Sequence, residues 1–186
     1  MPSDEIPPTA SSPAPREIGC LGTRLTVTDH PGALAWCRHL ARRPSPAAIE
    51  FCNTQIVTLR RSDADYRQTS ECFEHFIPDS SPLLWLLNAA GAGMKDRVYG
   101  PAFFRHALIH SPADLTHYFL GGSEACGRAL VERFTALNPS LKIVGSFHGR
   151  CDLGGFLGTD DSRILDEIRR IKPDFIWVGL GTPKQQ

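Results

Sequence analysis

Short apolar runs alternate along most of the chain with stretches in which apolar residues recur every three or four positions. A short apolar run predicts a strand, and the longer spacing predicts one face of a helix. The clearest example begins with the run Thr116–Leu120 and ends with the run Leu141–Val144. Between them, one face of a helix is predicted to hold Cys126, Leu130, Phe134 and Leu137. A strand, a helix and a strand in this order predict a right-handed crossover between parallel strands.

The same alternation continues on both sides of this unit. Further strands are predicted at residues 21–27, 47–52, 73–77 and 175–180, and helical pieces at residues 31–40, 55–61, 63–72, 82–87 and 101–109. A last helix is predicted after a cap at Asp160, and its sheet-facing residues are Ile164, Leu165, Ile168 and Ile171. Alternating strands and helices predict the α/β class, here a Rossmann-like fold with a mostly parallel sheet and helices on both faces.

The two ends of the chain differ in character. Residues 1–16 hold five Pro and three Ser without an apolar run, which predicts a disordered tail. We therefore expect a single α/β domain over residues 17–186. The last apolar run begins at Phe175 and predicts a strand buried on both faces. Because such a strand normally continues into a covering helix, we expect that a C-terminal part of the domain is missing.

Ligands in open α/β sheets bind just outside the carboxyl ends of the strands. The final strand gives way to Gly179, Gly181 and Pro183, which predict a loop at that position. The polar residues Lys184 and Gln185 of this loop are therefore candidates for ligand binding.

Composition narrows the class of protein only a little. Lys and Arg total 20 and so do Asp and Glu, so net charge indicates no nucleic-acid partner. The N-terminal segment lacks the apolar core of a secretory signal, and we expect a cytoplasmic protein. The six cysteines form no Cys-x-x-Cys pair, so we expect reduced thiols that serve as packing residues.

The loop Gly121-Gly122-Ser123 lies between a predicted strand and a predicted helix. Its backbone N–H groups could hold a phosphate, or the glycines could serve only a tight turn. The loop does not have the G-x-G-x-x-G spacing, and the next strand ends in Gly145 where a dinucleotide fold would place an acid. A nicotinamide site is therefore a weak hypothesis.

Metal binding has little support in the sequence. Asp63-Ala64-Asp65 has the D-x-D pattern that holds a metal and a diphosphate in many sugar transferases. Acids are also favoured in the first turn of a helix, where these two residues lie. The seven histidines are spread along the chain, and we expect no structural metal.

Three further residues follow predicted strands or turns. Asp79 comes after Pro78 and before a leucine-rich helix, so it could cap that helix or act as a general base with a raised pKa. Arg97 and Lys184 are cations that could bind a phosphate or remain solvated. Asn53 could bind a ligand or cap the helix that follows it.

The motifs, taken in order, resemble the WecG/TagA/CpsF family of bacterial glycosyltransferases. They are Asn53, Pro78-Asp79, Asp96-Arg97-Val98-Tyr99-Gly100, Phe119-Leu120-Gly121-Gly122, Asn138 to Gly145, His148-Gly149, Lys172-Pro173-Asp174 and Val178 to Gln185. The resemblance covers residues 17–186. It implies transfer of a sugar, usually from a UDP-linked donor, to a polyprenyl-diphosphate acceptor at the inner face of the membrane, with inversion and without a metal.

The resemblance also assigns roles to single residues. Asp79 matches the proposed base, and Asn53, Arg97 and Gln185 match other site residues. The chain departs from the family pattern at three positions, which are Phe51 in place of Thr, Ser80 in place of Gly and Gln186 in place of Glu. The family pattern continues with a segment that helps to close the site, and we expect this segment to be missing here.

Two other hypotheses remain beside an inverting glycosyltransferase. The chain could be a sugar-nucleotide-binding remnant with little turnover, or, less well supported, a nicotinamide oxidoreductase. Binding of UDP against binding of NAD, followed by a donor-hydrolysis assay, separates the three. An apolar face left open beside Trp177 would favour self-association, so a homo-oligomer is a further expectation.

Overall fold

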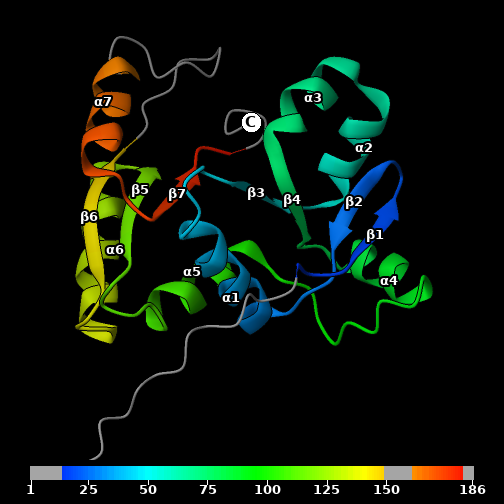
Figure 1. Cartoon of the computed structure of the whole chain (residues 1–186), viewed down its shortest axis with the longest axis horizontal. Coiled ribbons are helices and arrows are strands. Elements are labelled where there is room, and N and C mark those ends of the chain that lie inside the picture. Colours follow the sequence, from blue (N-terminus) through cyan, green and yellow to red (C-terminus); the bar gives the residue numbers. More distant parts are fainter. Residues whose placement is uncertain (1–13, 149–160, 182–186) are drawn as a thin grey trace, which may run out of the picture. The chain divides into compact units, whose positions relative to one another are not determined.

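The computed structural model describes residues 14–148 and 161–181 (Figure 1). The chain divides into two compact units, with the boundary between Gly100 and Pro101. Each unit contains its own β-sheet, and parallel pairing dominates in both sheets. The predicted α/β class is confirmed. The expectation of one domain over residues 17–186 stays a prediction.

The first unit holds a four-stranded sheet in the order β1-β2-β4-β3. Its strands are β1 (Glu17–Cys20), β2 (Thr23–Thr26), β3 (Ala48–Cys52) and β4 (Phe73–Pro78). β4 pairs in parallel with both β2 and β3, whereas β1 and β2 form an antiparallel hairpin. The strand predicted at residues 21–27 is wrong at its beginning, because Leu21 and Gly22 have φ values of 50° and 84° and form the two-residue hairpin turn.

The helices of this unit are α1 (His30–Ala41), α2 (Thr54–Ser62), α3 (Ala64–Thr69), the 3₁₀ turn η1 (Ser70–Cys72) and α4 (Ser81–Ala89). Side chains cap the first three helices. In each, a side-chain oxygen of the N-cap residue accepts a backbone N–H of the first turn, and the N-cap residues are Asp29, Asn53 and Asp63. α4 ends before Gly91 and Gly93, both of which have positive φ.

The core of the first unit lies between its sheet and helices α2 and α4. It contains Leu25, Cys52, Ile56, Val57, Phe76, Leu83 and Leu87. Arg60 covers the ring of Phe76 with its guanidinium 4.3 Å from the ring centroid, and it donates to Thr23 Oγ1 at 3.2 Å. A third partner, Ser70 Oγ, accepts from the same guanidinium. The positive charge near the core is therefore satisfied by hydrogen bonds and by the ring.

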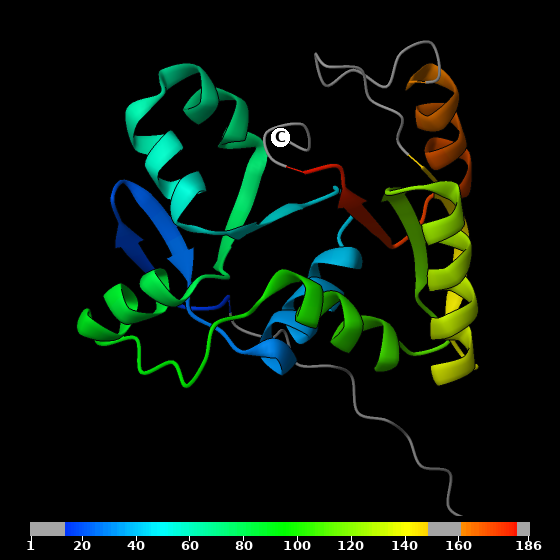
Figure 2. The same ribbon diagram turned by 180° about the vertical axis from the view of Figure 1, so that it is seen from behind.

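The second unit holds three parallel strands in the order β6-β5-β7. The strands are β5 (Thr116–Gly121), β6 (Lys142–Phe147) and β7 (Phe175–Gly179), and the helices are α5 (Gly100–Ile109), which begins at the boundary, α6 (Glu124–Leu137) and α7 (Asp161–Ile171). The parallel β5–α6–β6 crossover is confirmed, and Figure 2 shows α6 lying along β6. The predicted cap Asp160 lies outside the described residues.

Two predictions of burial in this unit are wrong. β7 lies at the edge of the three-stranded sheet, and its residues Ile176 and Val178 are 43% and 44% exposed. The strand therefore buries one face rather than two. In α7, Ile164 is buried as predicted, but Leu165 is 50% exposed because it lies one position further round the helix.

A hydrogen-bonded histidine lies in the core of the second unit. His117 is buried on β5, and its Nδ1 accepts from the indole N–H of Trp177 at 3.0 Å. Because indole can only donate, Nδ1 carries no proton, and a neutral ring must carry its proton on Nε2. Nε2–H then donates to Ser111 Oγ at 2.7 Å. This direction is opposite to that of a serine nucleophile and its base, so the pair is structural.

The cysteines of the described part of the chain are free thiols, as predicted. Cys37 and Cys52 are buried in the first unit. Burial raises the pKa of the Cys37 thiol to about 12 and raises that of Cys52 as well. A thiol that stays protonated at neutral pH is inert, which agrees with a packing role for these two. The packing role is wrong for Cys72 and Cys126, which are exposed. Cys151 lies outside the described residues.

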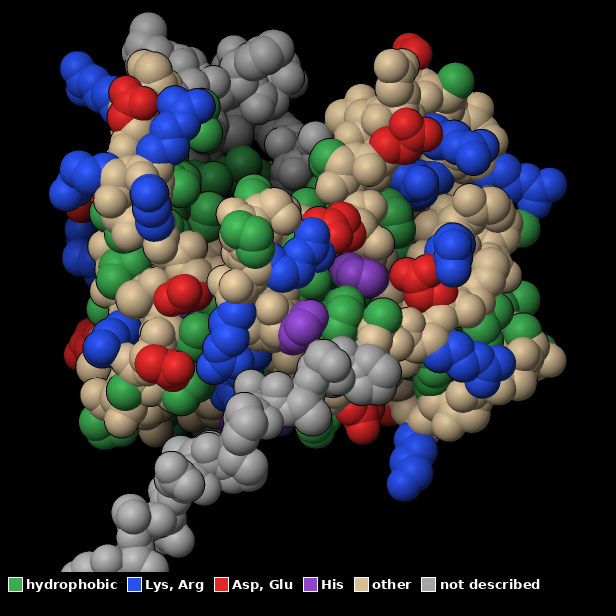
Figure 3. Space-filling view, in the orientation of Figure 1, with side chains coloured by type: hydrophobic (Ala, Val, Ile, Leu, Met, Phe, Trp, Pro, Cys, Tyr) green, Lys and Arg blue, Asp and Glu red, His purple; other side chains and the backbone are tan. Residues whose placement is uncertain are grey.

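The surface carries mixed charge. On the face drawn in Figure 3, Lys and Arg side chains are interspersed with Asp and Glu side chains and do not merge into one basic patch. Among the described residues, no helix is long and apolar enough to cross a membrane.

Gly145 on β6 should tolerate no side chain. A Cβ atom there would lie 2.4 Å from the ring of Tyr118, which is fully buried. We expect Gly145→Ala to lower the free energy of unfolding by about 1–3 kcal/mol, because the ring must move to relieve the overlap. Gly19→Ala is the control, since a Cβ there meets nothing within 4 Å. Urea unfolding of both variants checks this, and equal stability of the two would contradict the packing described here.

Candidate functional site

The carboxyl ends of β3 and β4 bring two candidate residues together. Cys52 and Pro78 are register partners, so Asn53 and Asp79 leave the sheet side by side. The backbone N–H of Asp79 donates to Cys52 O at 2.9 Å and extends the pairing by one residue. Polar side chains at this edge of a parallel sheet lie where α/β proteins bind ligands.

Asp79 does not cap the helix that follows it. α4 begins at Ser81, and its N-cap is Ser80, which makes no side-chain capping bond. The Asp79 carboxylate instead accepts the backbone N–H of Gly100. A Cβ on Gly100 would lie 3.4 Å from Phe51 Cβ and 3.8 Å from Asp79 Oδ2, so the backbone approaches both side chains closely. The alternative in which Asp79 is a helix cap is therefore wrong.

The carboxylate of Asp79 is half-buried, and this burial raises its pKa. The N–H of Gly100 and the charge of Arg97 favour the ionised form and offset part of that rise. The balance leaves the pKa above the ordinary value of an aspartate. A carboxylate of this kind is a better proton acceptor than a solvated one.

Arg97 is held against the same turn. Its Nη1 donates to Asp79 O at 2.9 Å, and its guanidinium lies 5.0 Å from the ring centroid of Tyr99. Its own backbone N–H donates to Asp96 Oδ1 at 2.7 Å. The bond to Asp79 uses one of five N–H donors, so a well-oriented guanidinium lies beside the candidate base.

Asn53 caps α2, which was one of the two roles predicted for it. Its Oδ1 accepts the backbone N–H of Ile56 at 3.1 Å. The oxygen of the amide is thus used in the fold, and the NH₂ group is the part that a ligand would engage.

Gly121 and Gly122 lie in the second unit, where they join β5 to α6. Gly121 has a φ of 125°, and a Cβ there would lie 2.4 Å from Gly179 O of β7. Ser123 caps α6 by accepting the N–H of Cys126 at 3.1 Å. The glycines therefore serve a tight turn, and the same turn leaves the amino end of a 14-residue helix beside them.

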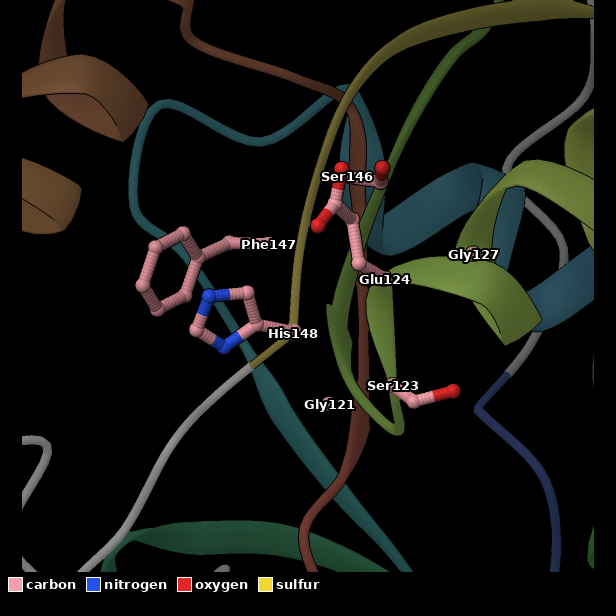
Figure 4. Close-up of a pocket in the computed structure, with 7 residues that line it drawn as sticks. All are labelled: Gly121, Ser123, Glu124, Gly127, Ser146, Phe147 and His148. Carbon is pink, nitrogen blue, oxygen red and sulfur yellow. The ribbon is translucent and has the colours of Figure 1, made fainter.

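A small depression lies at this turn. Its walls are Gly121, Ser123, Glu124, Gly127, Ser146, Phe147 and His148 (Figure 4). The rings of Phe147 and His148 stack with centroids 4.5 Å apart. Its volume of about 50 Å³ is far below the roughly 300–1,000 Å³ of a small-molecule site. By itself the depression could hold one group of a ligand, not a nucleotide sugar.

The D-x-D residues lie at a helix start. Asp63 caps α3 by accepting the N–H of Tyr66 at 3.0 Å, and Asp65 lies in the first turn. Within the described residues, no group of three or more His, Cys, Asp or Glu side chains is arranged to hold a metal ion.

One histidine pair on α5 was not predicted from the sequence. His106 and His110 have His-x-x-x-His spacing on α5, and their ring centroids are 4.3 Å apart. The spacing alone, read from the printed sequence, was signal enough to find them. His110 Nδ1 lies 2.8 Å from His106 O, so the second ring is tied to the helix backbone.

The remaining two predicted site residues, Lys184 and Gln185, lie outside the described residues. The site that the structure brings together is therefore the turn around Asp79, Arg97 and Asn53 in the first unit.

Comparison with known proteins identifies the family. The model of the glycosyl transferase WecG/TagA/CpsF family matches residues 18–186, almost the whole chain. The chain belongs to this family. The resemblance drawn from the motifs is thereby confirmed.

A curated relative adds a specific activity to the comparison. The chain is 22% identical over 150 residues to the N-acetylglucosaminyldiphosphoundecaprenol N-acetyl-beta-D-mannosaminyltransferase of Bacillus subtilis (strain 168). The match covers 80% of this chain and 56% of the relative, so the chain spans little more than half of that protein's length.

The raised pKa of Asp79 makes a prediction about stability. Because the folded pKa lies above the unfolded one, ionisation of Asp79 costs stability, and the cost appears as the pH rises through the folded pKa. Asp79→Asn removes this cost and keeps an oxygen for the Gly100 N–H. We expect the variant to gain stability relative to the parent chain between acidic and neutral pH. Chemical unfolding at several pH values measures the difference in stability between the variant and the parent. A difference that does not change with pH would contradict the raised pKa of Asp79.

Proposed function

We propose that this chain forms the sugar-transferring part of an inverting glycosyltransferase that makes a lipid-linked precursor of a cell-surface polysaccharide. The donor is a UDP-linked sugar, and the acceptor is a polyprenyl diphosphate that already carries a sugar. Membership of the family and the lipid-linked acceptor in the relative's name support this proposal. The observation that carries it is the half-buried carboxylate of Asp79, held at a strand end beside an arginine.

Asp79 acts as the general base in this proposal. The acceptor hydroxyl oxygen attacks the anomeric carbon while Asp79 takes its proton, and the bond from that carbon to the donor diphosphate breaks. Attack opposite the leaving group inverts the anomeric centre. The raised pKa of Asp79 suits this step, since a stronger base takes the proton more readily at the same geometry.

Cations and N–H groups stabilise the diphosphate as it leaves. Arg97 lies beside the base and offers planar donors to phosphate oxygens. We assign Gly121 and Gly122 to the donor on the resemblance alone. We assign Lys184 and Gln185 to the donor as well, on the resemblance alone, and Asn53 to the sugar or diphosphate through its NH₂ group.

We further propose that the reaction needs no metal ion. Asp63, the first acid of the D-x-D pattern, is engaged as a helix cap, which leaves the pattern without its usual role. The charge of the leaving diphosphate then falls to protein cations and N–H groups. The place of action in this proposal is the inner face of the cytoplasmic membrane, where the acceptor lipid is available.

The first prediction from this mechanism concerns the base. Asp79→Asn should lower the rate of transfer by about 10²–10⁴-fold while UDP binding stays within error, because a general base acts only in the chemical step. The parent rate should fall as the pH drops through the raised pKa of Asp79, since only the ionised form accepts a proton. Asp65→Asn, an exposed acid in α3, is the control and should keep the parent rate. Equal activity of Asp79→Asn and the parent would remove Asp79 from the chemistry.

The second prediction concerns the diphosphate. Arg97→Ala should weaken binding of UDP by about 1.5–3 kcal/mol, the range for a hydrogen bond to a charged group, and should leave uridine binding nearly unchanged. Arg24→Ala is the matched control, because Arg24 is an exposed arginine that pairs with Glu17 on the β1–β2 hairpin. Titration calorimetry with both ligands decides the matter. Equal losses for UDP and uridine would place Arg97 away from the diphosphate.

A further inference from the structure

Helix α4 differs from the other helices of the first unit in having no charged residue. Its sequence is Ser-Pro-Leu-Leu-Trp-Leu-Leu-Asn-Ala over residues 81–89. Leu83 and Leu87 are buried in the core, yet Trp85 is 68% exposed and Leu86 is 52% exposed. Pro82 and Ala89 are exposed as well. Asn88 is exposed too, but both groups of its amide bond to the backbone of Met94. An apolar helix face is normally covered, so the outer face of α4 is suited to a non-aqueous surrounding.

Exposed apolar side chains also follow the candidate base along the chain. Among the described residues of the first unit, four large apolar side chains are exposed, namely Leu21, Trp85, Leu86 and Tyr99. Three of the four follow Asp79 within 20 residues, and α4 begins two residues after it. In Figures 1 and 2, α4 lies near the open end of the β1–β2 hairpin, whereas the turn that contains Leu21 lies at the other end.

We propose that the outer face of α4, formed by Pro82, Trp85, Leu86 and Ala89, rests on the lipid bilayer that carries the acceptor. This inference rests on the proposed function, because only a lipid-linked acceptor requires the base to work at a membrane surface. Tryptophan is the side chain that prefers the boundary between lipid and water, and leucine beside it adds apolar area.

Charge around the helix fits an anionic bilayer. Arg16 is exposed, and its Nη1 donates to Gly91 O at 3.2 Å, which fixes a guanidinium just beyond the end of α4. Lys95 and Asp96 are both exposed in the loop that follows the helix, so Arg16 supplies the net positive charge there. Cations beside an interfacial helix are attracted to anionic headgroups over about a Debye length.

The test is a vesicle-binding assay with the double variant Trp85→Ser and Leu86→Ser. The matched control is the double variant Leu137→Ser and Leu165→Ser, because these two leucines of the second unit are 51% and 50% exposed. Each protein is floated with vesicles of phosphatidylethanolamine and phosphatidylglycerol. We expect on the order of tenfold weaker binding for the α4 variant, since binding scales with buried apolar area, and parent-like binding for the control. Equal binding of the α4 variant and the parent would overturn the proposal.

Two further measurements distinguish a loss of vesicle binding from misfolding and from failure of the proposed function. Circular dichroism of the α4 variant should match the parent, because both side chains are exposed. Brominated lipids should quench the fluorescence of the parent, and Trp85→Phe should lose most of that quenching. Quenching that persists in Trp85→Phe would place another tryptophan at the bilayer.

If the α4 variant instead changes only the sedimentation of an oligomer and not vesicle binding, the face contacts a second copy and the proposal is wrong. A chain that binds vesicles through α4 but never binds UDP would reject the proposed function and not this surface.

Discussion

The backbone at the carboxyl end of β4 is tied from three directions. Asp79 N donates to Cys52 O, Val98 N donates to Pro78 O, and Arg97 Nη1 donates to Asp79 O. The first bond aligns the turn with β3, and the other two bring the segment 97–100 back across it. The position of the carboxylate follows from these backbone bonds, so Asp79 needs no support from its own side chain beyond the N–H of Gly100.

The residues of this turn make structural contacts that use only part of their polar groups. Arg97 holds the carbonyl of Asp79, and Asn53 caps α2 through its amide oxygen. Burial raises the pKa of the Asp79 carboxyl, and the N–H of Gly100 and the charge of Arg97 offset part of that rise. In the proposed mechanism the raised pKa makes Asp79 a stronger base, and the same burial makes its ionised form less stable.

The sequence predicted those features that depend on local spacing. The β5–α6–β6 crossover, the caps at Asn53 and the limits of α1 and β3 follow from apolar periodicity and capping chemistry. Burial of β7 could not be predicted, because its edge position is a property of strand order and not of its own residues. The hairpin turn at Leu21 was missed because a leucine at positive φ is uncommon.

The candidate site was also predicted only in part from the sequence. The motifs singled out Asp79 and Arg97, but the sequence left open whether Asp79 was a helix cap, since Asp, Ser80 and Ser81 all favour that position. Only the geometry of the turn decides it, through Ser80 as the N-cap and Gly100 as the carboxylate's donor. Arg97 contacts Asp79 O, which lies 18 residues before it in the sequence, and the ring of Tyr99, which lies two residues after it. Neither contact has a sequence signature.

The two faces of α4 could not be told apart from the sequence. A helix without charged residues is predicted to lie in the core, because apolar composition cannot distinguish a protein interior from a bilayer. Exposure makes the distinction, since Leu83 and Leu87 are buried whereas Trp85 and Leu86 are not. Mutation of the inner pair would remove core contacts and destabilise the first unit, whereas change of the outer pair removes fewer contacts, since Trp85 and Leu86 are 68% and 52% exposed. Packing within the unit therefore accounts for the inner pair more fully than for the outer pair, and this difference is the basis for proposing a contact outside the protein.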